Sequence, residues 1–267
     1  MIRRRSQTTL LAAAMAVTAG FAATTQASLS PTGPGESLVF SDEFADNANN
    51  WSNVGSTATI STDPGSTGQS VWYPTTAGSG AVSSSVTLPT SIDIANGPIA
   101  VYFRVRVDKV NGSNNSRFSA SLYEESPDNG FAQWIPIPGG GVSVLKWRKS
   151  DGTVGVSSIT AISGYPDTST FQDFRLVFTN NGDGSATVEA FQYDTPSSQY
   201  VSKGSTSVMD LDGGLFNQVV IQSDNGDATG RAYFDSVQVT QVPEPATIGL
   251  FSLGAFFLLA RNNNFNH

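Results

Sequence analysis

Residues 100–107 read Ala-Val-Tyr-Phe-Arg-Val-Arg-Val, and this stretch decides the fold class. Every second residue from Val101 to Val107 is apolar, and Arg104 and Arg106 stand between them. Successive side chains of a β-strand point to opposite faces, so the alternation predicts a strand with one face in a hydrophobic core. No window of the chain sustains the 3.6-residue apolar period that an amphipathic helix requires.

Similar short runs recur along the chain and are separated by turn residues. They cover residues 117–123, 142–147, 174–178, 187–192, 218–221 and 232–239. Residues 180–184, Asn-Asn-Gly-Asp-Gly, readily take positive φ and predict a hairpin between two of these runs. Many short strands without intervening helices predict an all-β fold, an antiparallel β-sandwich, over residues 28–241.

The N-terminus has the pattern of a secretory signal peptide. Three arginines at positions 3–5 precede an apolar, alanine-rich run over residues 10–23, and small residues follow at positions 25–27. This order predicts a signal helix over residues 1–27 with cleavage after Ala27. The alternative, an N-terminal helix of the fold, is disfavoured because the run has no polar face.

The C-terminal residues 242–267 form a second apolar segment. Pro243, Glu244 and Pro245 lead into the apolar residues 246–260, which Arg261 closes before an asparagine-rich end. Fifteen helical residues rise about 22 Å against a hydrocarbon core of about 30 Å, so a helix here would reach the membrane but span it poorly.

This C-terminal order resembles the PEP-CTERM sorting signal of exported bacterial proteins. That signal combines a Pro-Glu-Pro motif, a short hydrophobic helix and a basic cluster, of which Arg261 alone is present here. The resemblance implies export to the cell surface or extracellular matrix, an exosortase-type processing partner and bacteria that make exopolysaccharide. The alternatives are a single-pass membrane anchor or a hydrophobic helix of the globular domain.

Charge and composition exclude several classes of function. Removal of residues 1–27 leaves 11 basic and 22 acidic residues, a net charge of −11, which disfavours nucleic acid as a partner. The chain has no cysteine, and its one histidine is His267 in the tail. A Ser-His-Asp triad, a Cys-His dyad and a histidine-ligated zinc site are therefore excluded from residues 28–241.

The middle of the chain resembles the concanavalin A-like, or laminin G-like, jelly roll. The resemblance rests on Ser-Asp-Glu-Phe at residues 41–44 with Trp51 after it, on residues 171–176 and on the closing run 232–239. The galactose-binding-like jelly roll, which holds calcium near its terminal strands, is the alternative. The concanavalin A-like fold implies that the first and last strands lie side by side.

A calcium site is the first candidate site. The jelly-roll resemblance would bring Asp42 and Glu43 close to Asp235, and carboxylate oxygens are ligands that Ca²⁺ prefers. The alternative is that Asp235 pairs with Arg231 or with a backbone amide. The loop Asp-Asn-Gly-Asp at residues 224–227 is a second candidate, although a tight turn would have the same composition.

Aromatic side chains suggest a sugar-binding surface. Trp134, Trp72 and Tyr73 lie in or near stretches rich in glycine and proline, where rings can be exposed to stack on a pyranose. The alternative for each tryptophan is core packing, which we predict for Trp51 and Trp147.

The sequence contains no recognisable catalytic motif. The Glu-x-Asp-x-Glu strand of concanavalin A-like glycosidases is absent, Glu124 and Glu125 would point to opposite faces of a strand, and Glu189 has no carboxylate two or four residues away. Polysaccharide lyases of this fold tend to use a tyrosine or histidine with an arginine and a glutamine, and the candidates for these roles are Tyr102, Arg104, Arg106 and Gln133. The spacing of these residues does not indicate whether they act together. We therefore expect a non-catalytic exported module that binds an extracellular polysaccharide or envelope component; the alternatives are a polysaccharide-degrading enzyme and a purely structural matrix protein.

Overall fold

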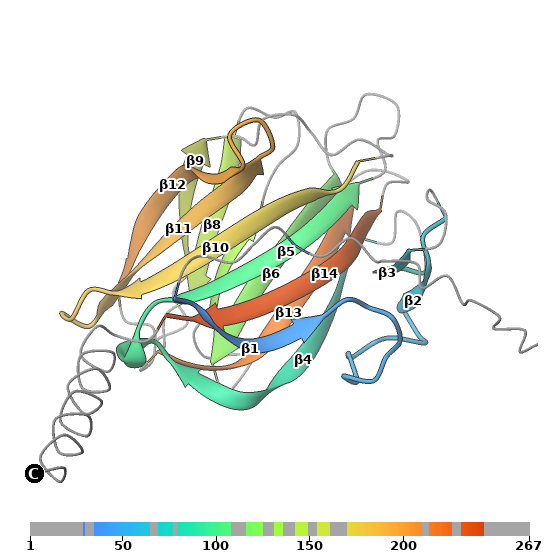
Figure 1. Ribbon diagram of the computed structural model, residues 1–267, viewed down its shortest axis with the longest axis horizontal. Helices are drawn as coiled ribbons and strands as arrows, with labels where there is room; N and C mark the ends of the chain where they lie inside the picture. The colour runs from blue at the N-terminus through green and yellow to red at the C-terminus, as the bar shows by residue number, and fades with distance from the viewer. Residues whose placement is uncertain are drawn as a thin grey trace, which may run out of the picture.

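A computed structural model describes the central part of the chain (Figure 1). The described residues are 29, 35–64, 69–76, 80–107, 116–124, 131–135, 142–148, 154–160, 170–209, 214–225 and 231–242. The predicted signal peptide and residues 243–267, including Pro243, Glu244, Pro245 and Arg261, lie outside them. Within the described ranges, no helix has the length and apolar character needed to cross a membrane.

The described residues form fourteen strands and one short 3-10 helix. In chain order they are β1 (Ser37–Asp42), β2 (Ala58–Thr62), β3 (Ser70–Pro74), β4 (Gly80–Asp93), η1 (Ile94–Asn96), β5 (Ile99–Val107), β6 (Ser116–Glu124), β7 (Phe131–Ile135), β8 (Val142–Arg148), β9 (Val154–Thr160), β10 (Gln172–Asn180), β11 (Ser185–Asp194), β12 (Gln199–Met209), β13 (Leu215–Asn225) and β14 (Ala232–Gln241).

The strands make two sheets that pack face to face (Figure 1). The eight-stranded sheet has the order β12-β11-β10-β5-β14-β3-β2, with β1 also paired to β14, and the six-stranded sheet has the order β4-β13-β6-β7-β8-β9. All pairings between these strands are antiparallel. The predicted antiparallel sandwich is confirmed, and so is the pairing of the first strand with the last.

The core lies between the sheets and is built largely of aromatic rings. Phe103 of β5 is completely buried, stacks on Phe174 with ring centroids 5.4 Å apart, and meets Phe118 of the other sheet at 6.3 Å. Trp51 is 2% exposed, and Trp147 packs against the core while remaining partly exposed. The predictions of a core face on β5 and of a core position for Trp51 are confirmed, whereas Trp147 lies at the edge of the core.

The hairpin between β10 and β11 has the predicted geometry. Gly182 and Gly184 have φ values of 78° and 82°, in the left-handed region that favours glycine. The side chain of Asn180 accepts a hydrogen bond from the Gly182 amide at 2.8 Å, and the Asn181 amide donates to the Ser185 carbonyl at 3.0 Å. These bonds close the turn and fix the register of the two strands.

Candidate functional site

The outer face of the eight-stranded sheet, opposite the core, carries charged residues in the middle of β5. Tyr102, Arg104 and Arg106 alternate with the residues of this strand that face the core, and therefore all three point outward. Tyr102 and Arg106 are nevertheless buried, because other parts of the chain cover this face. Each of the three side chains has a carboxylate partner.

Arg106 forms a buried ion pair with Asp63, which follows β2. Its Nε donates to Asp63 Oδ2 at 2.8 Å, and its Nη2 contacts Oδ1. The two side chains are 1% and 0% exposed, and the guanidinium lies 3.9 Å from the centre of the Tyr233 ring. The pair links the end of β2 to β5 within the eight-stranded sheet. Because both charged side chains are enclosed by protein, a ligand cannot reach them.

Arg104 lies between two carboxylates on neighbouring strands. Its Nε is 3.6 Å from Asp173 of β10 and 3.4 Å from Asp235 of β14, and its side chain is 22% exposed. The Phe171 ring lies 5.9 Å from the guanidinium. Arg104 is therefore the arginine of β5 that a solute at this face can reach.

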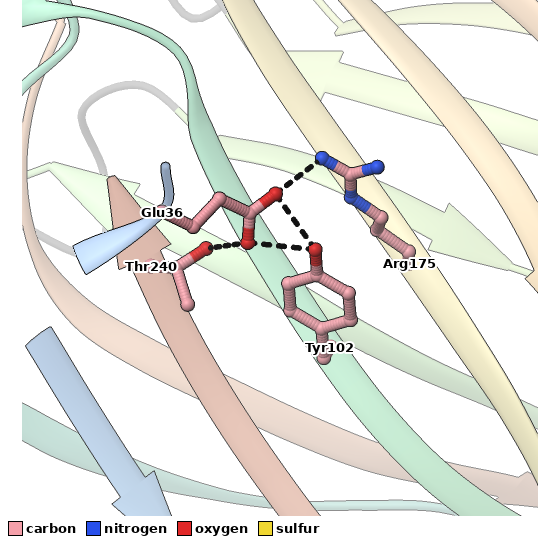
Figure 2. Close-up of polar contacts among 4 residues, drawn as sticks. All are labelled: Glu36, Tyr102, Arg175 and Thr240. Carbon is pink, nitrogen blue, oxygen red and sulfur yellow. Dashed lines mark hydrogen bonds and ion pairs between the residues drawn. The ribbon is translucent and has the colours of Figure 1, made fainter. Parts of the chain in front are cut away.

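Glu36, directly before β1, ties three strands together (Figure 2). Its carboxylate accepts hydrogen bonds from the Tyr102 hydroxyl at 2.7–2.8 Å, from Arg175 Nη2 at 2.7 Å and from the Thr240 hydroxyl at 2.7 Å. These partners belong to β5, β10 and β14, and the Glu36 side chain is 1% exposed. The cluster is a structural clamp for the segment that enters the domain.

A pocket of about 720 Å³ opens beside Arg104, at the start of β10 and around the turn between β11 and β12. It is lined by Arg104, Thr170, Phe171, Gln172, Asp173, Gln192, Tyr193, Asp194, Thr195, Pro196, Val201 and Lys203. Phe171 and Tyr193 supply aromatic rings, and Gln192 Nε2 donates to Gln172 Oε1 at 2.8 Å. Rings beside carboxylate, amide and cationic groups are the composition of a polar-ligand site.

Two pKa shifts describe the chemistry of the pocket and its surroundings. The hydroxyl and backbone amide of Ser197 donate to Asp194 and lower the pKa of this exposed carboxyl. Burial, with a smaller contribution from the charge of Asp173, raises the pKa of Tyr200, whose ring lies 5.3 Å from that of Tyr193. Asp194 is therefore a carboxylate at neutral pH and Tyr200 a neutral phenol.

The structure does not bring the three predicted sugar-binding aromatic residues together on one described surface. Trp72 is completely buried and donates through Nε1 to the Ser84 hydroxyl at 2.8 Å, so the prediction that it faces a ligand is wrong. Tyr73 is half-buried on the outer face, with its ring 5.1 Å from that of Tyr233. Trp134 belongs to β7, but its side chain lies outside the described residues, so its role stays a prediction.

Asp42, one of the three predicted calcium ligands, is surrounded by protein donors. Its Oδ1 accepts from the Phe44 amide at 2.6 Å, and its Oδ2 accepts from Asn49 Nδ2 at 2.8 Å and from Trp51 Nε1 at 2.6 Å. The carboxylate fixes the turn after β1 on the core side of the sheet. Glu43 next to it is exposed.

Asp235 lies on the opposite face of the same sheet from Asp42. The register shifts between Phe234 and Ser236, and the bulge places Asp235 beside Arg104. The described part of the chain contains no group of three acidic, histidine or cysteine side chains that could hold a metal ion. Calcium binding stays a prediction, and an arginine partner for Asp235 is observed, although it is Arg104 rather than Arg231.

The remaining candidates are dispersed. Tyr102, Arg104 and Arg106 share one face, whereas Gln133 belongs to β7 in the other sheet. Glu124 is buried and accepts a hydrogen bond from the Gly214 amide at 2.9 Å. Asp224 and Asn225 end β13, and the rest of their loop, like Glu125, lies outside the described residues; Glu189 accepts a hydrogen bond from Ser202.

Comparison of the sequence with protein families finds a match to the PEP-CTERM protein-sorting motif at residues 241–262. The chain ends in a PEP-CTERM sorting motif. The predicted resemblance of the C-terminal segment to a PEP-CTERM signal is confirmed, and the motif marks an exported protein that is sorted to the cell envelope. No curated protein sequence matches the chain.

Solved structures with a similar fold include two that act on polysaccharides. An endo-1,3-β-glucanase from Streptomyces sioyaensis is 14% identical with a TM-score of 0.50 and covers 81% of this chain and 100% of its own. An endo-β-1,4-glucuronan lyase from the fungus Trichoderma reesei is 12% identical with a TM-score of 0.53, covering 77% and 96%. The Lotus tetragonolobus seed lectin, 14% identical, has a TM-score of 0.47 and covers 77% and 99%. The likenesses to the glucanase and the lyase show the fold, a concanavalin A-like jelly roll.

Proposed function

We propose that this protein is a non-catalytic glycan-binding module of the bacterial cell surface. The observation that carries the proposal is the pocket beside Arg104, which combines the rings of Phe171 and Tyr193 with amide and carboxylate groups. A pyranose presents an apolar face for a ring and hydroxyl groups for planar polar side chains. A likeness in fold to proteins that act on polysaccharides agrees with the proposal but does not carry it.

Binding is favoured over cleavage by the state of the pocket's acidic groups. A glycosidase needs a carboxyl whose pKa is raised, so that it can protonate the leaving group. Asp194 has its pKa lowered by Ser197, and Asp173 lies 3.6 Å from Arg104. A lowered pKa suits the Asp194 carboxylate to accept hydrogen bonds from sugar hydroxyls rather than to donate a proton to a leaving group.

The sorting motif determines where we expect binding to occur. We propose that the apolar C-terminal run holds the protein in the inner membrane after export, and that an exosortase-type enzyme then removes it. The processed protein would be released to the cell surface or the extracellular matrix, where its partner is an extracellular polysaccharide or another envelope component. Intact mass of the protein recovered from outside the cell tests the processing directly.

Replacing Tyr193 with alanine is expected to weaken glycan binding about tenfold, because the ring would supply much of the apolar contact with a sugar. Isothermal titration of the exported protein with glycans selected on an array measures the change. The matched control is Tyr73→Ala, which removes a half-buried tyrosine from the same sheet face but from outside the pocket. Equal affinity of the Tyr193→Ala variant and the wild type would place the binding site elsewhere.

The ligand is expected to be a neutral glycan rather than a polyuronate. Arg104 already lies beside Asp173 and Asp235, and the charge of Lys203 contributes to the lowered pKa of Asp194. Residues 28–267 also carry a net charge of −11, which repels a polyanion. In matched pairs of oligosaccharides that differ in oxidation at C6, we expect about tenfold tighter binding of the neutral member at low salt. Tighter binding of the uronate, weakening as salt is added, would contradict this expectation.

A further inference from the structure

The sorting motif begins inside the folded domain. Its match starts at residue 241, and β14 ends at Gln241. In the sheet, Gln241 is paired with Ser37 of β1 on one side and Ile99 of β5 on the other. The amide of Val242 donates to the Pro98 carbonyl at 2.9 Å. The first two residues of the motif are therefore held by the sandwich.

The loop around η1 holds the side chain of Gln241 as well. Gln241 Nε2 donates to the carbonyls of Asp93 at 2.7 Å and Gly97 at 3.2 Å. The loop is itself fixed, because Asp93 accepts a hydrogen bond from the Ala95 amide and the Ile94 amide donates to the Gly214 carbonyl. We call the carbonyls of Asp93, Gly97 and Pro98 the η1 clamp.

Little chain separates the η1 clamp from the membrane segment. Three residues, Pro243, Glu244 and Pro245, lie between Val242 and the apolar run. Three extended residues span about 10 Å, so a membrane enzyme that binds the motif must work next to this end of the sandwich. Recognition of an extended peptide by strand addition uses the backbone groups of the peptide itself. The domain already bonds the Val242 amide to Pro98 and pairs Gln241 within the sheet.

We propose that the η1 clamp is the surface at which the processing protease meets this protein, and that it restrains removal of the tail. The end of β14 must separate from the clamp before the protease can take Gln241 and Val242. Strand ends open locally far more often than a whole domain unfolds, so the step slows processing without preventing it. The inference rests on the proposed processing of the tail and is independent of glycan binding.

Tail removal in Gln241→Ala tests the clamp, because this change deletes two side-chain hydrogen bonds and leaves the strand pairing intact. Pulse labelling of the full chain in the producing bacterium, followed by intact mass, gives the rate. We expect removal about fivefold faster than in the wild type, in line with the loss of two ordinary hydrogen bonds. The control is Gln238→Ala, a half-buried glutamine of the same strand outside the clamp, which should process at the wild-type rate.

A spacer variant distinguishes release from the η1 clamp from a general loss of stability as the cause of faster tail removal. Four Gly-Ser residues inserted between Val242 and Pro243 let the protease bind without opening the strand, so Gln241→Ala should no longer change the rate in that background. A Gln241→Ala effect that persists with the spacer, or no effect without it, overturns the clamp while the processing proposal stands. A wild-type tail that is never removed overturns the processing proposal and the clamp with it.

Discussion

Replacing Asp63 with asparagine is expected to lower the free energy of unfolding by about 3–5 kcal/mol. The change removes the negative charge that Asp63 places against the guanidinium of Arg106, at a position where the two side chains are 1% and 0% exposed. Breaking one half of a buried pair is costly because the remaining charge cannot regain water. Chemical denaturation of the variant, followed by tryptophan fluorescence, measures the loss.

Asp235→Asn is the matched control for Asp63→Asn. Asp235 is itself completely buried, but its partner Arg104 is 22% exposed and keeps Asp173 beside it when Asp235 is neutralised, so the loss should be smaller, about 1–2 kcal/mol. An apolar double variant, Asp63→Leu with Arg106→Met, should recover much of the stability because it removes both charges together. Equal losses in Asp63→Asn and Asp235→Asn would contradict the buried-pair interpretation.

The second large effect is expected at Asp42, whose replacement by alanine should cost about 3–4 kcal/mol. The carboxylate accepts from the Phe44 amide, the Asn49 side chain and Trp51 Nε1, and alanine would leave these donors without that acceptor. Thermal and chemical unfolding of the variant and the wild type give the loss.

Glu43→Ala provides the control, because this neighbouring carboxylate is exposed and its loss should stay within about 0.5 kcal/mol. The same pair of variants tests the calcium prediction. If the donors around Asp42 stabilise the turn, a chelator leaves the melting temperature of the wild type unchanged. A chelator that lowers it as far as Asp42→Ala does would show that a bound cation, and not the three donors, holds this turn.

Local sequence pattern was sufficient to predict the core but not what covers the outer face of the sheet. The alternation in residues 100–107 identified the buried face of β5, because side-chain period is a local property. That Arg106 is also buried depends on Asp63, 43 positions earlier in the chain. The partners of Glu36 lie 66, 139 and 204 positions away, so no local pattern could have indicated that cluster.

Trp72 shows why a ring in a glycine-rich stretch is a weak sign of exposure. Its hydrogen-bond partner Ser84 belongs to β4 of the other sheet, a strand rich in serine. Ser84 lies on the inward face between Val82 and Val86, where it accepts the indole N–H. A serine at an inward position hides the apolar alternation that would otherwise mark the strand. For the same reason, the strand β4 was not predicted from the sequence.

The calcium prediction shows the limit of inferring proximity from strand order. The first and last strands pair as the resemblance implied, with Asp42 opposite Val237. A bulge at Asp235 then turns its carboxylate to Arg104 on the other face. Bulges depend on how two strands fit, which a single sequence does not display.

The pocket combines residues from β5, β10, β11 and β12, and it was not predicted from the sequence for a related reason. The aromatic and polar side chains that line it are ordinary when each strand is read alone.

Size-exclusion chromatography with light scattering, run on the exported protein mixed with a polysaccharide chosen from an array, tests binding without cleavage most directly. We expect the protein to elute with the polymer, the polymer to keep its molar mass after prolonged incubation, and Tyr193→Ala to elute separately. A fall in the polymer's molar mass that disappears in Asp173→Asn would contradict binding without cleavage.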